Sequence, residues 1–213
     1  MEHEVNLIIK WIRDYVENSG AKGVIIGNSG GKDSAVVIGL CTKALGKDKV
    51  LAVALPCSSN LQDFEDAKLV ADTFGVKMIT IDLTNTYKTL LSSIEVETKE
   101  QIPSFSSINI RPRLRMTTLY AIGQAKGYLV AGTGNLCETF VGYTTKWGDN
   151  ASDFNPLAQF SVREVLEIGN IIGVPSKILE KAPNDGLGGG SDEAKLGVKY
   201  SQIEEFIKKR NMW

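Results

Sequence analysis

Short apolar runs alternate along the chain with longer amphipathic segments. The runs are rich in β-branched residues and predict buried strands, and the longer segments repeat their apolar residues at helical spacing. The expected strands are residues 21–26, 49–55, 76–81 and 128–131. The expected helices are residues 1–18, 33–45, 60–74, 84–96, 109–126, 161–173, 175–181 and 200–210. Because helices separate the strands, we expect an α/β fold: a doubly wound, mostly parallel sheet with helices on both faces.

Neither a repeat nor a linker divides the chain, so residues 1–213 are expected to form one domain. The polar stretch at 103–107 is expected to connect two helices. The glycine-dense stretch at 186–190 has two interpretations, which are a flexible surface loop and a mobile lid over an active site.

Composition excludes several classes of function. The formal net charge is −1, which gives no electrostatic reason to expect a nucleic acid or a membrane as partner. We find no signal peptide and no membrane-spanning run, so a cytoplasmic location is expected. The three cysteines form no CxxC pair, which argues against a disulfide framework. His3 is the only histidine, which argues against Ser-His and Cys-His nucleophilic sites and against histidine-based zinc catalysis.

The most informative motif is SGGKDS at residues 29–34, between the first expected strand and its helix. In a parallel sheet, this place lies at the carboxyl end of a strand, where ligands bind. Glycines allow close approach of the backbone, and the helix N-terminus presents free N–H groups and the positive end of its dipole. The hydroxyls and the lysine add donors and positive charge. Such a loop suits a phosphate or a pyrophosphate.

Two common phosphate motifs do not fit this loop. A Walker A loop needs a Ser or Thr where Asp33 stands, and a glycine where Ile26 stands. A Rossmann fingerprint does not start at Gly27 or at Gly30. Asp33 would repel phosphate unless a cation intervenes, which favours a Mg²⁺ that bridges Asp33 and phosphate oxygens.

The SGGKDS loop after the first strand resembles the pyrophosphate loop of the N-type ATP pyrophosphatases, which have an adenine nucleotide alpha hydrolase-like fold. The resemblance implies cleavage of ATP between its α and β phosphates, with transfer of AMP to an acceptor. Lys32, Asp33 and Ser34 would be catalytic. The implied ATP-binding residues are Gly27, Asn28, Ser29, Gly30, Gly31, Lys32, Asp33, Ser34, Thr133 and Asn184.

Further segments resemble the NAD synthetase family, in the order of that family and over nearly the whole chain. They are NIRPRLRM at 109–116, VAGTGNLCE at 130–138, VGYTTKWGD at 141–149 and SDE at 191–193. The resemblance implies a single NAD synthetase domain and the activity of a ligase. This ligase would use ATP to amidate deamido-NAD with ammonia, and the products would be NAD, AMP and pyrophosphate. The reaction would pass through an adenylated carboxylate. The resemblance also implies a homodimer.

The same resemblance assigns roles to residues outside the loop. Mg²⁺ would be held by Asp33 and Glu138, and ATP would be the co-substrate. The implied contacts of deamido-NAD are Arg113, Lys146, Asp149 and Asp153. Glutamine-using relatives carry an extra amidase domain, for which this chain has no room, so no glutaminase domain is expected and ammonia is the expected nitrogen donor.

Two positions and the end of the chain depart from the pattern of the family. Val162 stands where many members carry a phosphate-contacting lysine, and the adjacent Arg163 would leave the helix in a different direction. Asn184 replaces a Ser or Thr, and the end of the chain is compressed. Two alternatives therefore stay open: another adenylating enzyme of the superfamily, and a non-catalytic module that binds ATP or AMP.

Overall fold

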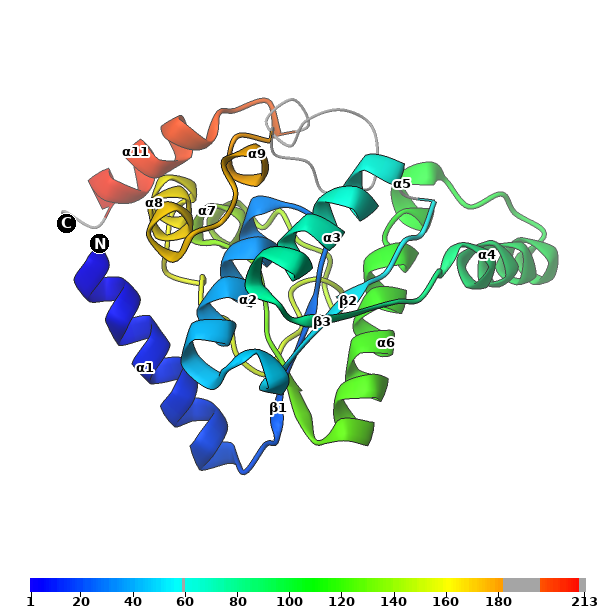
Figure 1. The fold of residues 1–213 in the computed structure, drawn as a ribbon. Coiled ribbons are helices and arrows are strands. Elements are labelled where there is room, and N and C mark those ends of the chain that lie inside the picture. The colour runs from blue at the N-terminus through cyan, green and yellow to red at the C-terminus, as the bar shows by residue number, and fades with distance from the viewer. Residues whose placement is uncertain (59, 182–195, 211–213) are drawn as a thin grey trace.

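The computed structural model describes residues 1–58, 60–181 and 196–210, and within them it contains one four-stranded sheet (Figure 1). Its strands are β1 (Gly23–Gly27), β2 (Val50–Ala54), β3 (Lys77–Thr80) and β4 (Tyr128–Val130). They lie in the order β3-β2-β1-β4, and each neighbouring pair is parallel. The predicted parallel sheet is confirmed.

Helices cover both faces of this sheet. Alternate residues of β1 point to opposite sides, so each face of the sheet is apolar and has its own core. Val24 and Ile26 belong to one apolar core, and Ile25 belongs to another. The first core is covered by α1 (Glu2–Ser19), α2 (Lys32–Leu45), α3 (Leu61–Phe74) and α8 (Val162–Ile172). The second is covered by α4 (Thr84–Thr98) and α6 (Ile110–Lys126). Figure 1 shows the sheet between α2 and α6, as the doubly wound prediction requires.

Residue type explains why these elements form where they do. All residues of β2 are buried, which suits an uninterrupted apolar run in a parallel sheet. In α1, the buried residues recur at helical spacing, and Gly20 ends the helix in the left-handed conformation, with φ 71°. The buried residues of α1 are Val5, Ile8, Ile12 and Val16.

Several short elements differ from the sequence prediction. The stretch 103–107 was expected to connect helices without being helical, but it contains one turn, α5 (Ser104–Ser107). A six-residue helix that was not predicted, α7 (Leu136–Val141), follows β4, and a 3₁₀ turn, η1 (Lys47–Lys49), precedes β2. The helix expected at 175–181 is only α9 (Ser176–Leu179). The last helix, α11 (Tyr200–Arg210), is as predicted.

The strand order creates the place where the loops after β1 and β4 can meet. After β1 the chain continues to β2 on one side, whereas β4 lies on the other side of β1. In open parallel sheets, such a reversal leaves a crevice outside the carboxyl ends of the strands, where ligands bind. Within the described part of the chain, no helix has the length and apolar character needed to cross a membrane.

Candidate active site

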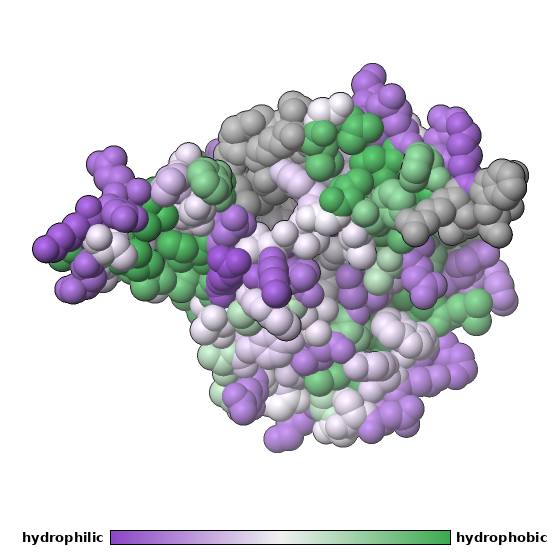
Figure 2. Space-filling model, turned by 180° about the vertical axis from the view of Figure 1, so that it is seen from behind, coloured by the Kyte–Doolittle hydropathy of each residue, from purple (hydrophilic) through white to green (hydrophobic). Residues whose placement is uncertain are grey.

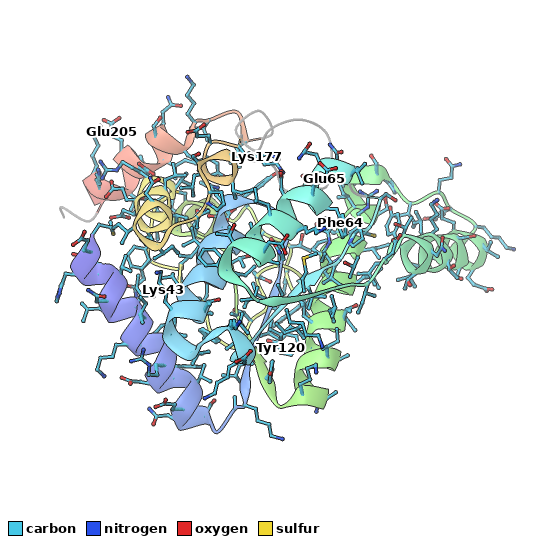
Figure 3. The ribbon with its side chains drawn as sticks, viewed as in Figure 1. Lys43, Phe64, Glu65, Tyr120, Lys177 and Glu205 are labelled. Atoms are coloured by element: carbon cyan, nitrogen blue, oxygen red, sulfur yellow. The ribbon has the colours of Figure 1, made fainter. Side chains whose placement is uncertain are left out.

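A cavity of about 610 Å³ opens at the carboxyl ends of β1, β2 and β4. Its walls come from the loop after β1, the end of β2, the first turns of α3, one side of α6 and the segment after β4. Phe64, which is labelled on α3 in Figure 3, forms part of one wall. The cavity therefore occupies the crevice that the strand order creates.

The glycine loop, residues 27–34, takes its shape from α3. Asn28 is almost fully buried; its side chain donates to the carbonyl of Ala67 over 2.8 Å and accepts from the backbone N–H of Gly30 over 3.2 Å. Gly30 has φ 73°, and a Cβ there would collide with the carbonyl oxygen of Asp63 and lie 2.9 Å from the nitrogen of Ala67. Only glycine fits this contact without strain.

The polar side chains of the loop bond to one another in this structure. Gly31 is the N-cap of α2 and caps it without a side chain, so the N–H groups of the first turn of α2 can face a ligand. The hydroxyl oxygens of Ser29 and Ser34 lie 3.1 Å apart. The Lys32 ammonium lies 2.8 Å from the Asp33 carboxylate and is mostly buried. All the predicted loop residues except Gly30 line the cavity.

Two predicted metal ligands from distant parts of the sequence face the same cavity. Asp33 is on the first turn of α2 and Glu138 is on the first turn of α7. Asn135 connects them: its side-chain amide donates to Asp33 Oδ1 over 3.3 Å, and its backbone N–H donates to Glu138 Oε2 over 2.9 Å. The structure thus brings together residues that are about one hundred positions apart.

This pair of carboxylates fits a Mg²⁺ whose ligands come partly from the protein and partly from a substrate. In the described residues, no group of three or more His, Cys, Asp or Glu side chains could hold a metal. Mg²⁺ usually keeps several waters and is held by one or two carboxylates together with phosphate oxygens. Two carboxylates beside a phosphate-binding loop match that requirement. A site in which the protein supplies every ligand is not needed for Mg²⁺.

The turn after β4 forms the part of the cavity wall next to the glycine loop. Thr133, a predicted ATP contact, lines the cavity. The segment that follows α7 holds this turn in place: the side-chain amide of Asn155 donates to the carbonyl of Gly134 over 2.8 Å, and a Cβ on Gly132 would lie 2.6 Å from Ser152 Oγ. Asn184, the other predicted ATP contact outside the loop, lies outside the described residues, as does the stretch 186–190.

The four residues predicted to bind deamido-NAD do not gather at this cavity. Asp149 lines it, and its carboxylate accepts from the backbone N–H of Thr145 over 2.7 Å. Arg113 donates to the carbonyl of Lys146 over 3.1 Å, so these two residues lie together. The carboxylate of Asp153 accepts from the backbone N–H of Val130 over 2.7 Å, and this contact ties it to β4. Arg113, Lys146 and Asp153 are not part of the cavity wall.

A cluster of charges that sequence reasoning missed joins Lys177 and Lys181 to α3, the helix that lies against the glycine loop. Lys181 lies 2.8 Å from both Asp63 and Asp66, and Lys177, which Figure 3 labels beside α3, lies 2.8 Å from Asp66. The side chain of Asp66 is only 2% exposed. Desolvation raises the pKa of Asp66, but hydrogen bonds from Lys177, Lys181 and Gln62 outweigh it and lower the pKa to about 2. Only the i, i+3 spacing of the two aspartates on α3 hinted at this cluster.

Val162 lies inside an apolar cluster and does not face the cavity. It packs with Cys137 of α7 and with Tyr200, Ile203 and Ile207 of α11. Arg163 is exposed, and its guanidinium lies 3.9 Å from Glu167, a partner on its own helix. Arg163 therefore does not reach the cavity in place of a lysine at position 162.

The chain resembles known proteins over nearly its whole length. Residues 4–212 match the model of a family described as NAD synthase. The chain is 40% identical to the NH(3)-dependent NAD(+) synthetase of Carboxydothermus hydrogenoformans, covering 97% of this chain and 85% of that protein. It is 43% identical to the protein of the same name from Methanocaldococcus jannaschii, covering 98% of this chain and 81% of that protein.

A solved structure has the same fold. The NMN synthetase of Francisella tularensis superposes with a TM-score of 0.91 at 36% identity, covering 98% of this chain and 86% of that chain. The parallel sheet and the glycine loop at its carboxyl edge agree with these matches. The chain belongs to the NAD synthase family.

Proposed function

We propose that this chain catalyses the ATP-dependent amidation of deamido-NAD with ammonia, giving NAD, AMP and pyrophosphate. One observation carries the proposal: the glycine loop, the N-terminus of α2 and the carboxylates of Asp33 and Glu138 all face one cavity at the switch point of the sheet. This arrangement suits a nucleoside triphosphate whose phosphates share a metal ion with the protein. Membership of the family supplies the acceptor and the nitrogen donor.

In this proposal, the phosphates of ATP lie along residues 27–34 and the N-terminus of α2. The N–H groups of that turn and the Lys32 ammonium stabilise the negative charge that develops when pyrophosphate leaves. Ser29 and Ser34, which now bond within the loop, exchange those bonds for phosphate oxygens. Thr133 would contact ATP from the turn after β4, which lines the same cavity. Asn184 remains a predicted ATP contact outside the described residues.

Asp33 and Glu138 would hold Mg²⁺, which when bound neutralises phosphate charge and orients the triphosphate. The protein then needs no general base for the first step, because the substrate carboxylate is already a nucleophile. The carboxylate oxygen attacks the α-phosphate, and the bond to the β-phosphate breaks. Ammonia next attacks the acyl carbon, the bond to AMP breaks, and a proton is released to solvent. The site contributes alignment and charge stabilisation.

Deamido-NAD would contact Arg113, Lys146, Asp149 and Asp153 in this proposal. Arg113 and Lys146 already lie together, and they supply the positive charge that a dinucleotide pyrophosphate requires. Asp149 lines the ATP cavity and lies on the turn that carries Lys146, so it connects the two groups of residues. The reacting carboxylate would enter the cavity from that side.

A second candidate acceptor is the mononucleotide, which would yield NMN. The observation that favours it is the TM-score of 0.91 to a protein named NMN synthetase. The chemistry at the carboxylate would be the same in both cases. The two candidates differ in whether the outer group around Arg113 contacts a second nucleotide.

A direct assay separates these possibilities. Purified protein is incubated with ATP, Mg²⁺ and ammonium, with either deamido-NAD or nicotinic acid mononucleotide, and the amide product and pyrophosphate are measured. We expect NAD from deamido-NAD, with little product when glutamine replaces ammonium. A higher kcat/KM with the mononucleotide would identify NMN as the product. Pyrophosphate released without either amide would indicate another adenylating enzyme.

Asp33→Ala is the control for the site. This change removes one carboxylate from the cavity, and we expect NAD formation to fall by at least a hundredfold while the folded protein persists, as judged by circular dichroism. If the wild-type chain binds ATP tightly but releases no pyrophosphate with any acceptor, it is a binding module and the proposed function is wrong.

We also propose that the chain forms a homodimer. The helix α4 projects from the body and carries apolar side chains, which are green at the left of Figure 2. Val96 of α4 is 68% exposed, and Phe105 of α5 is 75% exposed. Large exposed apolar residues favour a protein interface. Light scattering coupled to gel filtration should give twice the chain mass, and Phe105→Glu should give the monomer.

A further inference from the structure

Asn135 occupies the point where the two carboxylate-bearing turns meet. It is 0% exposed and is the N-cap of α7. Its side-chain oxygen accepts from the backbone N–H of Glu138 over 3.1 Å, while its own backbone N–H donates to Glu138 Oε2 over 2.9 Å. These two bonds form a capping box, and they fix the Glu138 side chain relative to the helix.

The other end of the same side chain reaches a different element. The amide nitrogen of Asn135 donates to Asp33 Oδ1 over 3.3 Å, so it links α7 to the first turn of α2. The second oxygen of Asp33 is occupied by the Lys32 ammonium at 2.8 Å. One buried residue thus contacts both carboxylates, and each contact places an N–H group on a carboxylate oxygen.

This arrangement has an electrostatic consequence. Two carboxylates that face one cavity repel each other, and an N–H group bonded to each stabilises the charged form of both. A capping residue needs only to accept a bond from its helix, so the bond from Asn135 to Asp33 serves no capping purpose. Partners of this kind orient metal ligands, and their loss typically lowers metal affinity by about 10–100-fold.

We propose that Asn135 is a positioning residue that holds Asp33 and Glu138 in the relative orientation that one Mg²⁺ requires when ATP is bound. This inference rests on the proposed function, because it needs ATP and Mg²⁺ at this cavity. Asn135 does not touch the reacting atoms. It acts through the two carboxylates. Its loss should therefore lower the affinity for the metal, and turnover should change only as a consequence.

The test measures the gain in nucleotide affinity that a metal provides. Isothermal titration gives the Kd of α,β-methylene-ATP, whose α–β linkage cannot be cleaved, once with Mg²⁺ and once with EDTA. The ratio of the two constants is the metal-dependent gain. Asn135→Ser keeps a good N-cap and removes the amide donor to Asp33. Glu138→Gln removes one ligand and serves as the reference.

Asn60→Ser is the matched control. Asn60 also lines the cavity and also caps a helix, because its side-chain oxygen accepts from the backbone N–H of Gln62 over 3.1 Å. We expect the metal-dependent gain of Asn135→Ser to be about tenfold smaller than that of the wild type. The Kd of this variant with EDTA should stay at the wild-type value. Asn60→Ser should keep the full gain.

Three results would overturn the inference. One is a wild-type gain in Asn135→Ser together with a loss in Glu138→Gln, because Asn135 would then be a helix cap only. Another is an equal loss in Asn60→Ser, because any weakened cap would then have the same effect. The third is a wild-type gain in Glu138→Gln. If the wild-type chain still forms NAD in that case, the inference fails and the proposed function stands.

Discussion

Gly30 shows how a single residue determines the shape of the loop. Its positive φ and its contact with the backbone of α3 are separate constraints, and both exclude a side chain. Gly20 offers a comparison, because it has nearly the same φ, 71°, but no atom lies within 4 Å of the place that a Cβ would take there. Substituting alanine at each glycine and comparing the two losses in free energy of unfolding therefore gives the cost of the collision with α3.

We therefore expect Gly20→Ala to lower the free energy of unfolding by about 1 kcal/mol, the conformational cost alone. Gly30→Ala should cost more, about 2–4 kcal/mol, because the colliding atoms belong to the backbone and cannot rotate away. Urea denaturation of both variants measures the difference. Equal losses would mean that α3 moves aside without cost.

Asp66 gives a prediction about pH. Its pKa is about 2 in the folded chain and 3.8 without the fold, so the unfolded chain binds the proton more readily. The stabilisation is fully present above about pH 5 and is lost as the pH falls toward 2. Asp66→Asn should lower the free energy of unfolding by roughly 2 kcal/mol at pH 7. Urea denaturation should show the gap to wild type narrowing below about pH 4 and closing only near pH 2, and a constant gap would contradict the assigned partners.

At this scale, residues that are contiguous in sequence could be predicted and residues that meet across the fold could not. The glycine loop is a local motif, and its residues were identified together. The pairing of Lys181 with Asp63 and Asp66 joins positions more than one hundred apart, and each residue alone looks like an ordinary charged helix surface. Asn135 lay within an identified segment, but its contact with Asp33 depends on the fold that brings the start of α7 to the start of α2.

At the scale of elements, buried strands and long helices were predictable because their patterns extend over many residues. The strands β1 and β2 end within two residues of their predicted bounds, and α2 begins one residue earlier than expected. By contrast, α7 has six residues, too few to show helical periodicity. Its only local signal was the Asn135 to Glu138 spacing of a capping box.

The packing of α11 on α7 yields a prediction for an element far from the glycine loop in sequence. Ile203 is 4% exposed and packs with Cys137 of α7, on the turn that carries Glu138. Ile203→Ala should lower the free energy of unfolding by about 2–4 kcal/mol and weaken the metal-dependent gain in nucleotide affinity. Lys208→Ala, on the exposed side of α11, should stay within about 0.5 kcal/mol of wild type. Chemical denaturation and titration calorimetry measure the two effects.

For the whole molecule, topology decides where the chemistry can lie. The sequence predicted a parallel sheet but did not specify the strand order, because order depends on which crossovers pack together. The order β3-β2-β1-β4 places β4 beside β1, and only then do the loops after these two strands share a cavity. Arg113 and Lys146 lie outside that cavity, so in the proposed function the acceptor would need contacts that the cavity alone does not supply.

The distance along the chain between Asp33 and Glu138 has a thermodynamic consequence. A ligand that needs both carboxylates cannot bind the unfolded chain, where those positions are far apart and disordered relative to each other. In the proposed function, binding is therefore linked to folding, and Mg²⁺ with ATP would act as a reversible cross-link between the first and the fourth strand-helix units. At one hundred times its Kd, such a ligand should add about 2.7 kcal/mol to the free energy of unfolding, and the thermal midpoint should rise accordingly. In Asp33→Ala, the ligand should not change the thermal midpoint. If it also leaves the midpoint of the wild-type chain unchanged, the two units do not share the ligand.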